Sequence, residues 1–300
     1  MSPQNEPRPT KAERTAQARE KARLIREAQA KKEKRNSWLI RGGVLVAAVA
    51  IVVIVALFIV QAQTNNAPIA NSGPVPANAN AYGGVVLGKD SAVIAPATTV
   101  TSVDRTTLPA APTAQPTAAF GLSEIGIAAA GKGKPVQVVA YIDFICPHCQ
   151  AFEATNSAQI QKWQAAGQIT MEYRPTGLLD AFTSTNYSSR SAAAAACVVN
   201  TAPAKFQAYL NALFAQQPAE NSAGLDNSKL ISIASDAGAG DISSCVNDKT
   251  YRPYVANTTA GAIAHGVTGT PTIFVNGVQD TNTDDFQTTV TAAIAANTAK

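Results

Sequence analysis

The order of hydrophobic and polar positions divides the chain into four stretches, and the most apolar of them predicts a membrane span. Residues 42–60 form an uncharged run of 19 amino acids. In a helix with a rise of about 1.5 Å per residue, this run covers most of the ~30 Å hydrocarbon core of a bilayer. With its flanks it predicts a transmembrane helix over residues 38–62, with Trp38 at the interface. A core helix would carry a polar stripe and a cleavable signal peptide a shorter apolar run, so we expect an uncleaved anchor.

The residues before the apolar run are polar and basic. Residues 11–34 are rich in Ala, Glu, Lys, Arg and Gln, which predicts a solvated helix beside anionic lipid, whereas a coiled coil would need an apolar heptad seam. Five Lys and Arg residues lie just before the span, and the first basic residue after it is Lys89. The positive-inside rule therefore places the basic tail, residues 1–37, in the cytoplasm and all residues after the span outside.

The next stretch, residues 63–118, is predicted to be a linker. Residues 61–118 contain seven prolines, many Ala, Asn and Thr residues and almost no charge. Such a composition buries too little apolar surface to offset the entropy lost on ordering. Within it, residues 82–94 combine Val and Ile with three glycines, so this part could pair as an edge hairpin.

Residues 119–300 have the pattern of a compact α/β domain. An apolar, β-branched run at 136–142 predicts a central strand, followed by a helix from Pro147 to about residue 166 and a second strand at 169–173. This order forms a parallel β-α-β unit with a right-handed crossover. We expect Phe144, Phe152, Trp163 and Phe206 in the core.

The remainder of this domain is rich in alanine and then returns to a strand. Helices are predicted at 189–199, 204–216 and 228–237, and somewhere within 241–265, because Pro and Gly residues separate these segments. A strand follows at 272–276, with a hairpin turn at Asn276–Gly277 and a final helix at 284–296.

Charge is unevenly distributed along the 300 residues, and this excludes one class of function. The first 41 residues hold 12 basic and 5 acidic side chains, whereas the others hold 12 basic and 15 acidic ones. The overall charge of +4 is therefore a property of the tail. A nucleic-acid-binding protein should carry its basic surface on the folded domain, so this class is not favoured.

The candidate chemistry lies where the first strand of the domain meets its helix, at Cys146-Pro147-His148-Cys149. Two cysteines three residues apart on a first helical turn are close enough to form a disulfide. Cys146 would lie at the helix N-terminus, where the helix dipole and free N–H groups stabilise a thiolate. Pro147 fits the first helical position, and His148 can add a positive charge or a donor. A stabilised thiolate favours the reduced dithiol and makes the disulfide an oxidant.

This motif has two other interpretations. A Cys-x-x-Cys pair is half of a zinc site, but Cys197 and Cys245 are far apart in sequence and the only other histidine is His265, which we interpret as structural. An inert structural disulfide seldom occupies a strand-to-helix turn. We therefore expect neither a metal nor an organic cofactor.

Together with two later motifs, this sequence resembles the DsbA-like branch of the thioredoxin superfamily, of the membrane-anchored actinobacterial kind. The motifs are Tyr141-Ile142-Asp143-Phe144-Ile145-Cys146-Pro147-His148-Cys149, Gly266-Val267-Thr268-Gly269-Thr270-Pro271-Thr272 and Val275-Asn276-Gly277. The resemblance implies a thioredoxin fold with a helical insertion, about residues 178–264, between the second and third core strands. It also implies that Pro271 is a cis-proline facing the cysteines and that the backbone of Thr270 pairs with substrate. Asp143 either tunes the thiol pair or is a solvated carboxylate.

The other two cysteines are best interpreted as a structural pair. Four cysteines on the exported side permit three connectivities, and pairing Cys146 with Cys149 leaves Cys197 with Cys245. Related actinobacterial proteins often carry such a second disulfide, and a second redox relay is the alternative.

The predicted function is oxidation of thiols in exported proteins by an extracytoplasmic, single-pass membrane enzyme. A substrate thiolate would attack Cys146, and a second would resolve the mixed disulfide. The expected partners are folding exported proteins with free cysteines and a membrane redox partner that reoxidises the site. A disulfide reductase or isomerase with the same site is one alternative, and a non-enzymatic thioredoxin-like binding module is another.

Overall fold

The computed structural model describes residues 68–107 and 121–298, together with nine residues between 19 and 32. The chain divides into two compact units, Met1–Thr64 and Asn65–Lys300. In the first unit the nine described residues are helical and exposed, as predicted for the basic tail. The predicted transmembrane helix over residues 38–62 lies outside the described residues. Within them, no helix is both long enough and apolar enough to cross a membrane.

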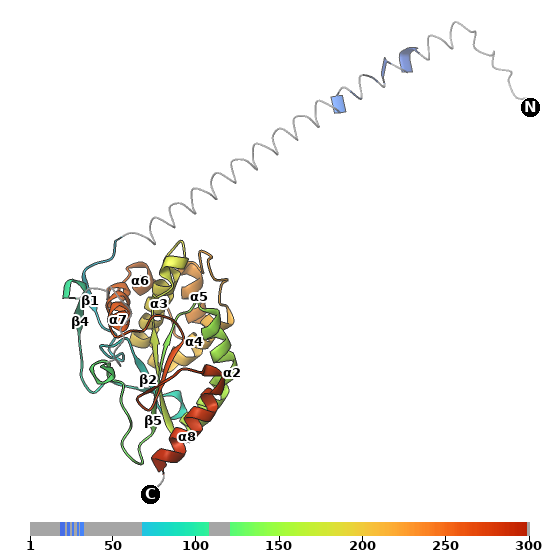
Figure 1. Cartoon of the computed structure of the whole chain (residues 1–300). Helices are drawn as coiled ribbons and strands as arrows, with labels where there is room; N and C mark the ends of the chain where they lie inside the picture. Colours follow the sequence, from blue (N-terminus) through green and yellow to red (C-terminus); the bar gives the residue numbers. More distant parts are fainter. Residues whose placement is uncertain are drawn as a thin grey trace, which may run out of the picture. The chain divides into compact units, whose positions relative to one another are not determined.

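A six-stranded mixed sheet forms the centre of the second unit (Figure 1). Its strand order is β3-β2-β6-β5-β7-β8, and β5 and β6 are the parallel pair. The strands are β2 (Val85–Leu87), β3 (Val93–Ile94), β5 (Val136–Ile142), β6 (Ile169–Pro175), β7 (Thr272–Val275) and β8 (Val278–Asp280). The predicted central strand and the predicted parallel unit are therefore confirmed.

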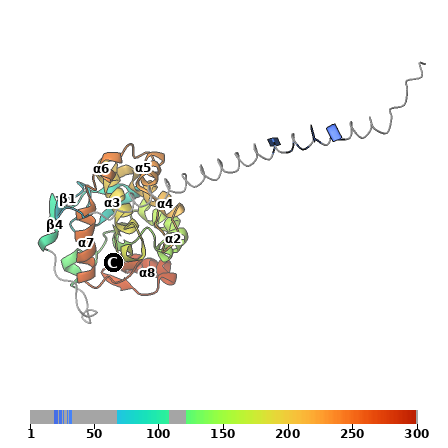
Figure 2. The same ribbon diagram turned by 90° about the horizontal axis from the view of Figure 1, so that it is seen from above.

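Strand β5 is apolar along its whole length because both faces of the sheet are covered. Val138 and Ala140 belong to the core under α2 (Pro147–Ala165) and α8 (Phe286–Thr298). Val139 and Tyr141 point to the opposite face, where Phe274 of β7 packs with the end of α7 (Arg252–Ala264). Both views show α2 and α8 on one side of the molecule and α7 on the other (Figures 1 and 2).

Aromatic side chains join α2 and α8 across the first face. Phe152 and Phe286 form an edge-to-face pair with ring centroids 4.9 Å apart, and Trp163 packs on the same Phe286 ring. Such pairs contribute about 1 kcal/mol beyond their burial. Phe152, Trp163, Phe144 and Phe206 are all buried, as predicted.

Helices occupy the chain between β6 and β7, where the helical insertion was predicted. They are α3 (Tyr187–Thr201), α4 (Phe206–Ala215), α5 (Asn227–Asp236), α6 (Ser243–Asn247) and α7. The sequence predicted one helix within residues 241–265, but there are two. The chain turns between them at Lys249, whose φ of 57° is left-handed and ends α6.

The prediction of an unordered linker is wrong for residues 68–107. Strands β1 (Ser72–Pro74) and β4 (Ser102–Asp104) form a separate antiparallel pair beside α7. Strands β2 and β3 form the predicted edge hairpin, and β2 pairs with β6. The average composition hides a few apolar side chains that become buried against the domain: Val75, Ala79, Val85, Leu87 and Val103.

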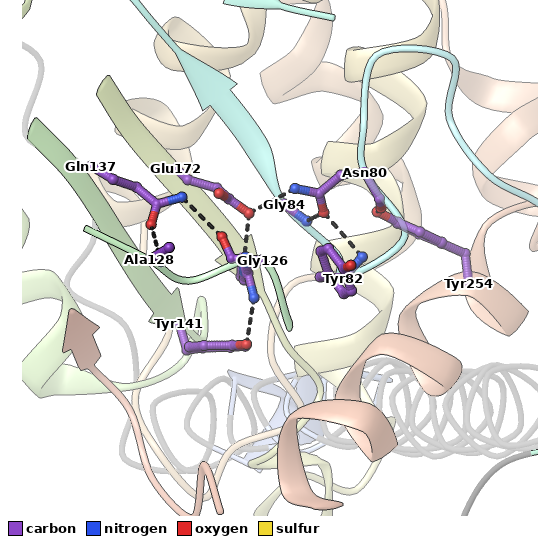
Figure 3. Close-up of polar contacts among 10 residues, drawn as sticks. Asn80, Tyr82, Gly84, Gly126, Ala128, Gln137, Tyr141, Glu172 and Tyr254 are labelled. Carbon is purple, nitrogen blue, oxygen red and sulfur yellow. Dashed lines mark hydrogen bonds and ion pairs between the residues drawn. The ribbon is translucent and has the colours of Figure 1, made fainter. Parts of the chain in front are cut away.

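A buried polar network fastens this N-terminal segment to the sheet (Figure 3). Asn80 Nδ2 donates to Glu172 Oε1 at 2.8 Å, and the same oxygen accepts from Arg174 Nε at 2.7 Å. Arg174 also donates to the Tyr141 hydroxyl at 2.7 Å, and its guanidinium lies 5.4 Å from the centroid of the Tyr82 ring. Both charges of the buried Glu172–Arg174 ion pair keep hydrogen bonds, and Arg174 Nη2 alone of that guanidinium has no partner among the described residues.

The turn before β2 requires a glycine. A Cβ atom on Gly84 would lie 1.9 Å from Glu172 Oε1, well inside van der Waals contact. The Gly84 N–H also donates to Asn80 Oδ1 at 2.8 Å. The close approach therefore lets one asparagine bind both the hairpin backbone and the buried carboxylate.

Candidate active site

The end of β5 and the start of α2 position the first cysteine. Strand β5 ends at Ile142, the chain turns through a Cys146 N–H to Asp143 carbonyl bond of 3.1 Å, and α2 begins at Pro147. Cys146 is the N-cap residue, with extended backbone (φ −73°, ψ 117°). Pro147 occupies the first turn, where its missing N–H costs no helical bond. The local sequence thus places a thiol at the N-terminus of a 19-residue helix.

Four groups surround the Cys146 sulfur. Its Sγ lies 3.1 Å from the Thr270 carbonyl oxygen. The Cys149 thiol donates to it, and so do the backbone N–H groups of His148 and Cys149. The Cys149 hydrogen bond is the largest cause that lowers the pKa of Cys146 to about 6, against the opposing effect of burial. The site therefore favours a thiolate at neutral pH.

Cys149 has the opposite character. Its side chain is fully buried, and this burial raises its pKa well above the usual value. Its hydrogen bond to Cys146 and the negative charge on Cys146 act in the same direction. Both cysteines are free thiols in this structure. One nucleophilic sulfur and one protonated sulfur therefore lie on the same helical turn.

Asp143 is buried, so the interpretation as a solvated carboxylate is wrong. One carboxylate oxygen accepts from the Ile145 N–H at 3.1 Å and the other from the Leu179 N–H at 3.0 Å. Burial raises its pKa to about 7, and these hydrogen bonds partly oppose the shift. Asp143 thus connects the loop that carries Cys146 to the inserted helices.

The loop before β7 faces the cysteines from another part of the chain. The Thr270–Pro271 peptide bond is cis, as the resemblance implied, and the Thr270 carbonyl contacts Cys146. The structure therefore brings together Cys146, Cys149, Asp143 and Thr270. The side chains of Pro147 and His148 point outward and are exposed, so they form the rim of the site.

One contact of the site had no signal in the sequence. Gln217, just after α4, donates its side-chain amide to the carbonyls of Phe144 (3.2 Å) and Cys146 (3.0 Å). The inserted helices thus hold the backbone of the cysteine loop directly. Gln217 and Cys146 are 71 residues apart in the sequence, and the residues around Gln217 give no indication that folding brings the two into contact.

The other two cysteines are bonded to each other. Cys197 in α3 and Cys245 in α6 form a disulfide with a Cα–Cα distance of 6.1 Å. The predicted pairing is confirmed, and it joins two helices of the insertion. Within the part of the chain that the structure describes, no three His, Cys, Asp or Glu side chains lie together as metal ligands.

A thioredoxin-type sheet, a Cys-x-x-Cys at the start of a helix and a facing cis-proline loop define a dithiol protein of the thioredoxin class. The comparison with protein families gives the same result independently. The chain belongs to the thioredoxin family, because the family model described as Thioredoxin matches residues 126–294.

Solved structures of named proteins are also similar to this chain. DsbA from Mycobacterium tuberculosis is 31% identical, over 56% of this chain and 88% of that chain, with a TM-score of 0.48. DsbG from the same organism is 29% identical, over 57% and 91%, with a TM-score of 0.48. MdbA from Actinomyces oris, a thiol-disulfide oxidoreductase, is 18% identical, over 75% and 92%, with a TM-score of 0.50. A comparison with curated proteins gives no match.

The family match agrees with the thioredoxin-superfamily part of the resemblance that the motifs indicated. The likeness to the 18% identical protein from Actinomyces oris shows the fold.

Proposed function

We propose that this protein is an extracytoplasmic thiol-disulfide oxidoreductase that introduces disulfide bonds into exported proteins. The observation that carries the proposal is the asymmetry of the two thiols. The pKa of Cys146 is lowered to about 6, whereas that of Cys149 is raised well above its usual value. A sulfur that is stable as an anion is a good leaving group in thiol-disulfide exchange.

The reaction begins from the oxidised form, in which Cys146 and Cys149 are joined. A substrate thiolate attacks Cys146 Sγ, the S–S bond breaks, and Cys149 leaves as a thiolate and takes up a proton. A second substrate thiolate then attacks the substrate sulfur of the mixed disulfide, and Cys146 leaves as the stabilised thiolate. The substrate loses two electrons and gains a disulfide, and the Cys146–Cys149 disulfide is reduced by the same two electrons.

The surroundings of Cys146 suit a substrate chain. The Thr270 carbonyl at 3.1 Å from the sulfur can accept from a backbone N–H of an extended peptide, as in strand addition. The exposed rim of Pro147 and His148 leaves the approach open. Folding exported proteins with free cysteines are the proposed substrates, and a membrane redox partner would restore the disulfide.

The proposed location rests on the sequence. An apolar run with a basic flank on its N-terminal side would anchor the chain with the tail in the cytoplasm and the catalytic domain outside. The Cys197–Cys245 disulfide supports this side of the membrane, because structural disulfides persist in oxidising compartments.

Two cysteine variants test the reaction. A substrate protein whose cysteine carries an activated disulfide is incubated with Cys149→Ser of the full chain. The Cys146 thiolate should attack the substrate sulfur, the activating thiolate should leave, and the mixed disulfide between Cys146 and the substrate should be isolated. The matched variant Cys146→Ser should give none. Equal trapping by both variants would refute the assignment of Cys146 as the sulfur that bonds to the substrate.

The direction of electron flow needs a separate measurement. Equilibration of the full chain with glutathione gives its reduction potential, and an oxidase should lie well above that of thioredoxin, about −270 mV. A value near or below about −250 mV would identify a reductase instead. Labelling of Cys146 in intact cells by a membrane-impermeant thiol reagent tests the location, and protection from the reagent would contradict it.

A further inference from the structure

A polar cleft lies away from the cysteines, between α7, the start of α3 and the ordered N-terminal segment. Its volume is about 620 Å³, and Asn71, Arg105, Asp180, Ser189 and Arg252 are among the residues that line it. Both views place β1 and β4, whose ends carry Asn71 and Arg105, beside α7 (Figures 1 and 2). The cleft therefore exists only because residues 68–107 pack on the domain.

Two arginines in the cleft each have an Nε donor that no hydrogen bond satisfies in the described part of the chain. Arg252 is 7% exposed, and its Nε is a buried donor without a hydrogen bond. The Nε of Arg105, which also lines the cleft, is unpaired as well. Among the described residues, no carboxylate comes within 4 Å of either guanidinium.

Asp180, the one acidic side chain among the described residues that line the cleft, is already engaged. Asp180 accepts from the Ser189 N–H at 3.0 Å and from the Ser189 hydroxyl, at the first turn of α3. The negative charge of Asp180 reduces the positive potential at the two arginines, but Asp180 forms no ion pair with either of them. On the other side of Arg252, Arg190 and Lys249 line an adjoining small cavity and add positive charge.

A largely buried guanidinium with an unsatisfied donor is costly, and this cost points to a missing anion. A bound counter-ion that accepts a hydrogen bond from Arg252 Nε would remove the cost. Burial lowers the pKa of Arg252, and the positive charge of Arg105 acts in the same direction, whereas the charge of Asp180 opposes the shift. The rest of the exported part is slightly acidic, so this concentration of basic side chains is local.

We propose that this cleft binds a phosphate group. The two arginines that line the cleft present several N–H donors, which match the tetrahedral oxygens and double charge of phosphate better than the two oxygens of a carboxylate. The phosphate can belong to the headgroup of an anionic phospholipid or to a solute. The lipid source has support from the sequence alone, since Pro68 lines the cleft and the predicted apolar run ends at residue 60 of the same chain.

Titration with inorganic phosphate tests the site. The full chain in neutral detergent is titrated at constant ionic strength, with binding measured by calorimetry and by the rise in Tm. Arg252→Gln should weaken binding by about ten- to a hundredfold, the usual effect of losing charge-assisted hydrogen bonds. Lys162→Gln, which removes an exposed charge on α2, is the matched control and should bind like the wild type.

A second arginine variant and a second anion give further results that can contradict the proposal. If Arg252→Gln does not fold, Arg105→Gln at the half-buried partner should weaken binding in the same way. Absence of phosphate binding by the wild type, equal binding by Arg252→Gln and Lys162→Gln, or acetate binding as tight as phosphate would each overturn the proposal. The binding measurement does not depend on the activity of Cys146, so its result is independent of the proposed redox function.

Nanodiscs distinguish the two sources. The full chain is placed in discs of phosphatidylcholine alone or with phosphatidylglycerol, and hydrogen exchange is measured in α7 without added phosphate. Protection that needs the anionic lipid and is lost in Arg252→Gln supports a headgroup ligand. Protection in either disc only after phosphate is added supports a solute ligand and the same site.

Discussion

Two replacements of Cys149 separate the contribution of its thiol to the acidity of Cys146. The Cys149 hydrogen bond is the largest cause of the lowered pKa. Cys149→Ala removes the donor, and Cys149→Ser keeps a donor of similar size at the same fully buried position. The two variants therefore differ mainly in one hydrogen bond to the Cys146 thiolate.

The expected shift follows from the strength of that bond. A hydrogen bond to a charged group contributes about 1.5–3 kcal/mol, which corresponds to about one to two pKa units. From its value of about 6, the pKa of Cys146 should rise to about 7–8 in Cys149→Ala and stay near 6 in Cys149→Ser. At pH 7 the thiolate fraction in the alanine variant should fall from about nine-tenths to between about one-tenth and one-half.

The rate of alkylation of Cys146 by iodoacetamide, measured from pH 4 to 10, gives the pKa directly, and absorbance near 240 nm checks it. Only one reactive thiol remains in each variant because Cys197 and Cys245 are bonded. Identical titration curves for the alanine and serine variants would show that the Cys149 hydrogen bond does not lower the pKa. A wild-type value near that of a free thiol, about 8.5, would refute the activated thiolate itself.

Three further predictions follow from the same structure. Cys146 ionises near pH 6, whereas Cys149 stays protonated to much higher pH. The reduction potential should therefore fall by about 59 mV per pH unit below pH 6 and by about 30 mV per pH unit above it. A single slope across pH 5–8 would contradict the difference in pKa between the two thiols. The pKa of Asp143 is raised to about 7, so its contribution to stability is complete below about pH 4 and is lost as the pH rises to 7. Relative to Asp143→Asn, the wild type should therefore lose up to about 4 kcal/mol in urea unfolding between these values, and an unchanged difference would refute this. Replacing both Cys197 and Cys245 by alanine opens a loop closed over 48 residues and should lower the free energy of unfolding by about 4 kcal/mol, with thiol exchange rates unchanged; slowed exchange would support a redox role for that pair.

Local pattern was sufficient for most elements of the domain. Strand β5 has the predicted bounds because a continuous β-branched run buried on both faces has few alternatives. The Asn276–Gly277 turn was predicted because both residues adopt positive φ, which few other pairs tolerate. The sequence does not predict the ordered structure of residues 68–107, because that structure depends on contacts with residues far away in the chain, such as Asn80 with Glu172.

The residues of the site likewise divide into those that the local sequence predicts and those that it does not. The positions of Cys146 and Cys149 follow from a helix start, which is a local feature. The approach of Thr270 was implied by the family resemblance, because 124 residues separate it from Cys146. The burial of Asp143 and the contacts of Gln217 depend on how the inserted helices pack, and no single stretch of sequence determines this.

The antiparallel pairing of β2 with β6 has a practical consequence for anyone who shortens the chain. The matched family region begins at residue 126, and a truncated protein cut there would lack β2 and β3. The backbone N–H and C=O groups of β6 that now bond β2 would be left free along an uncovered edge, and such edges recruit strands from neighbouring molecules. A recombinant fragment trimmed to the family region would therefore tend to aggregate, and its insolubility would say nothing about its redox chemistry.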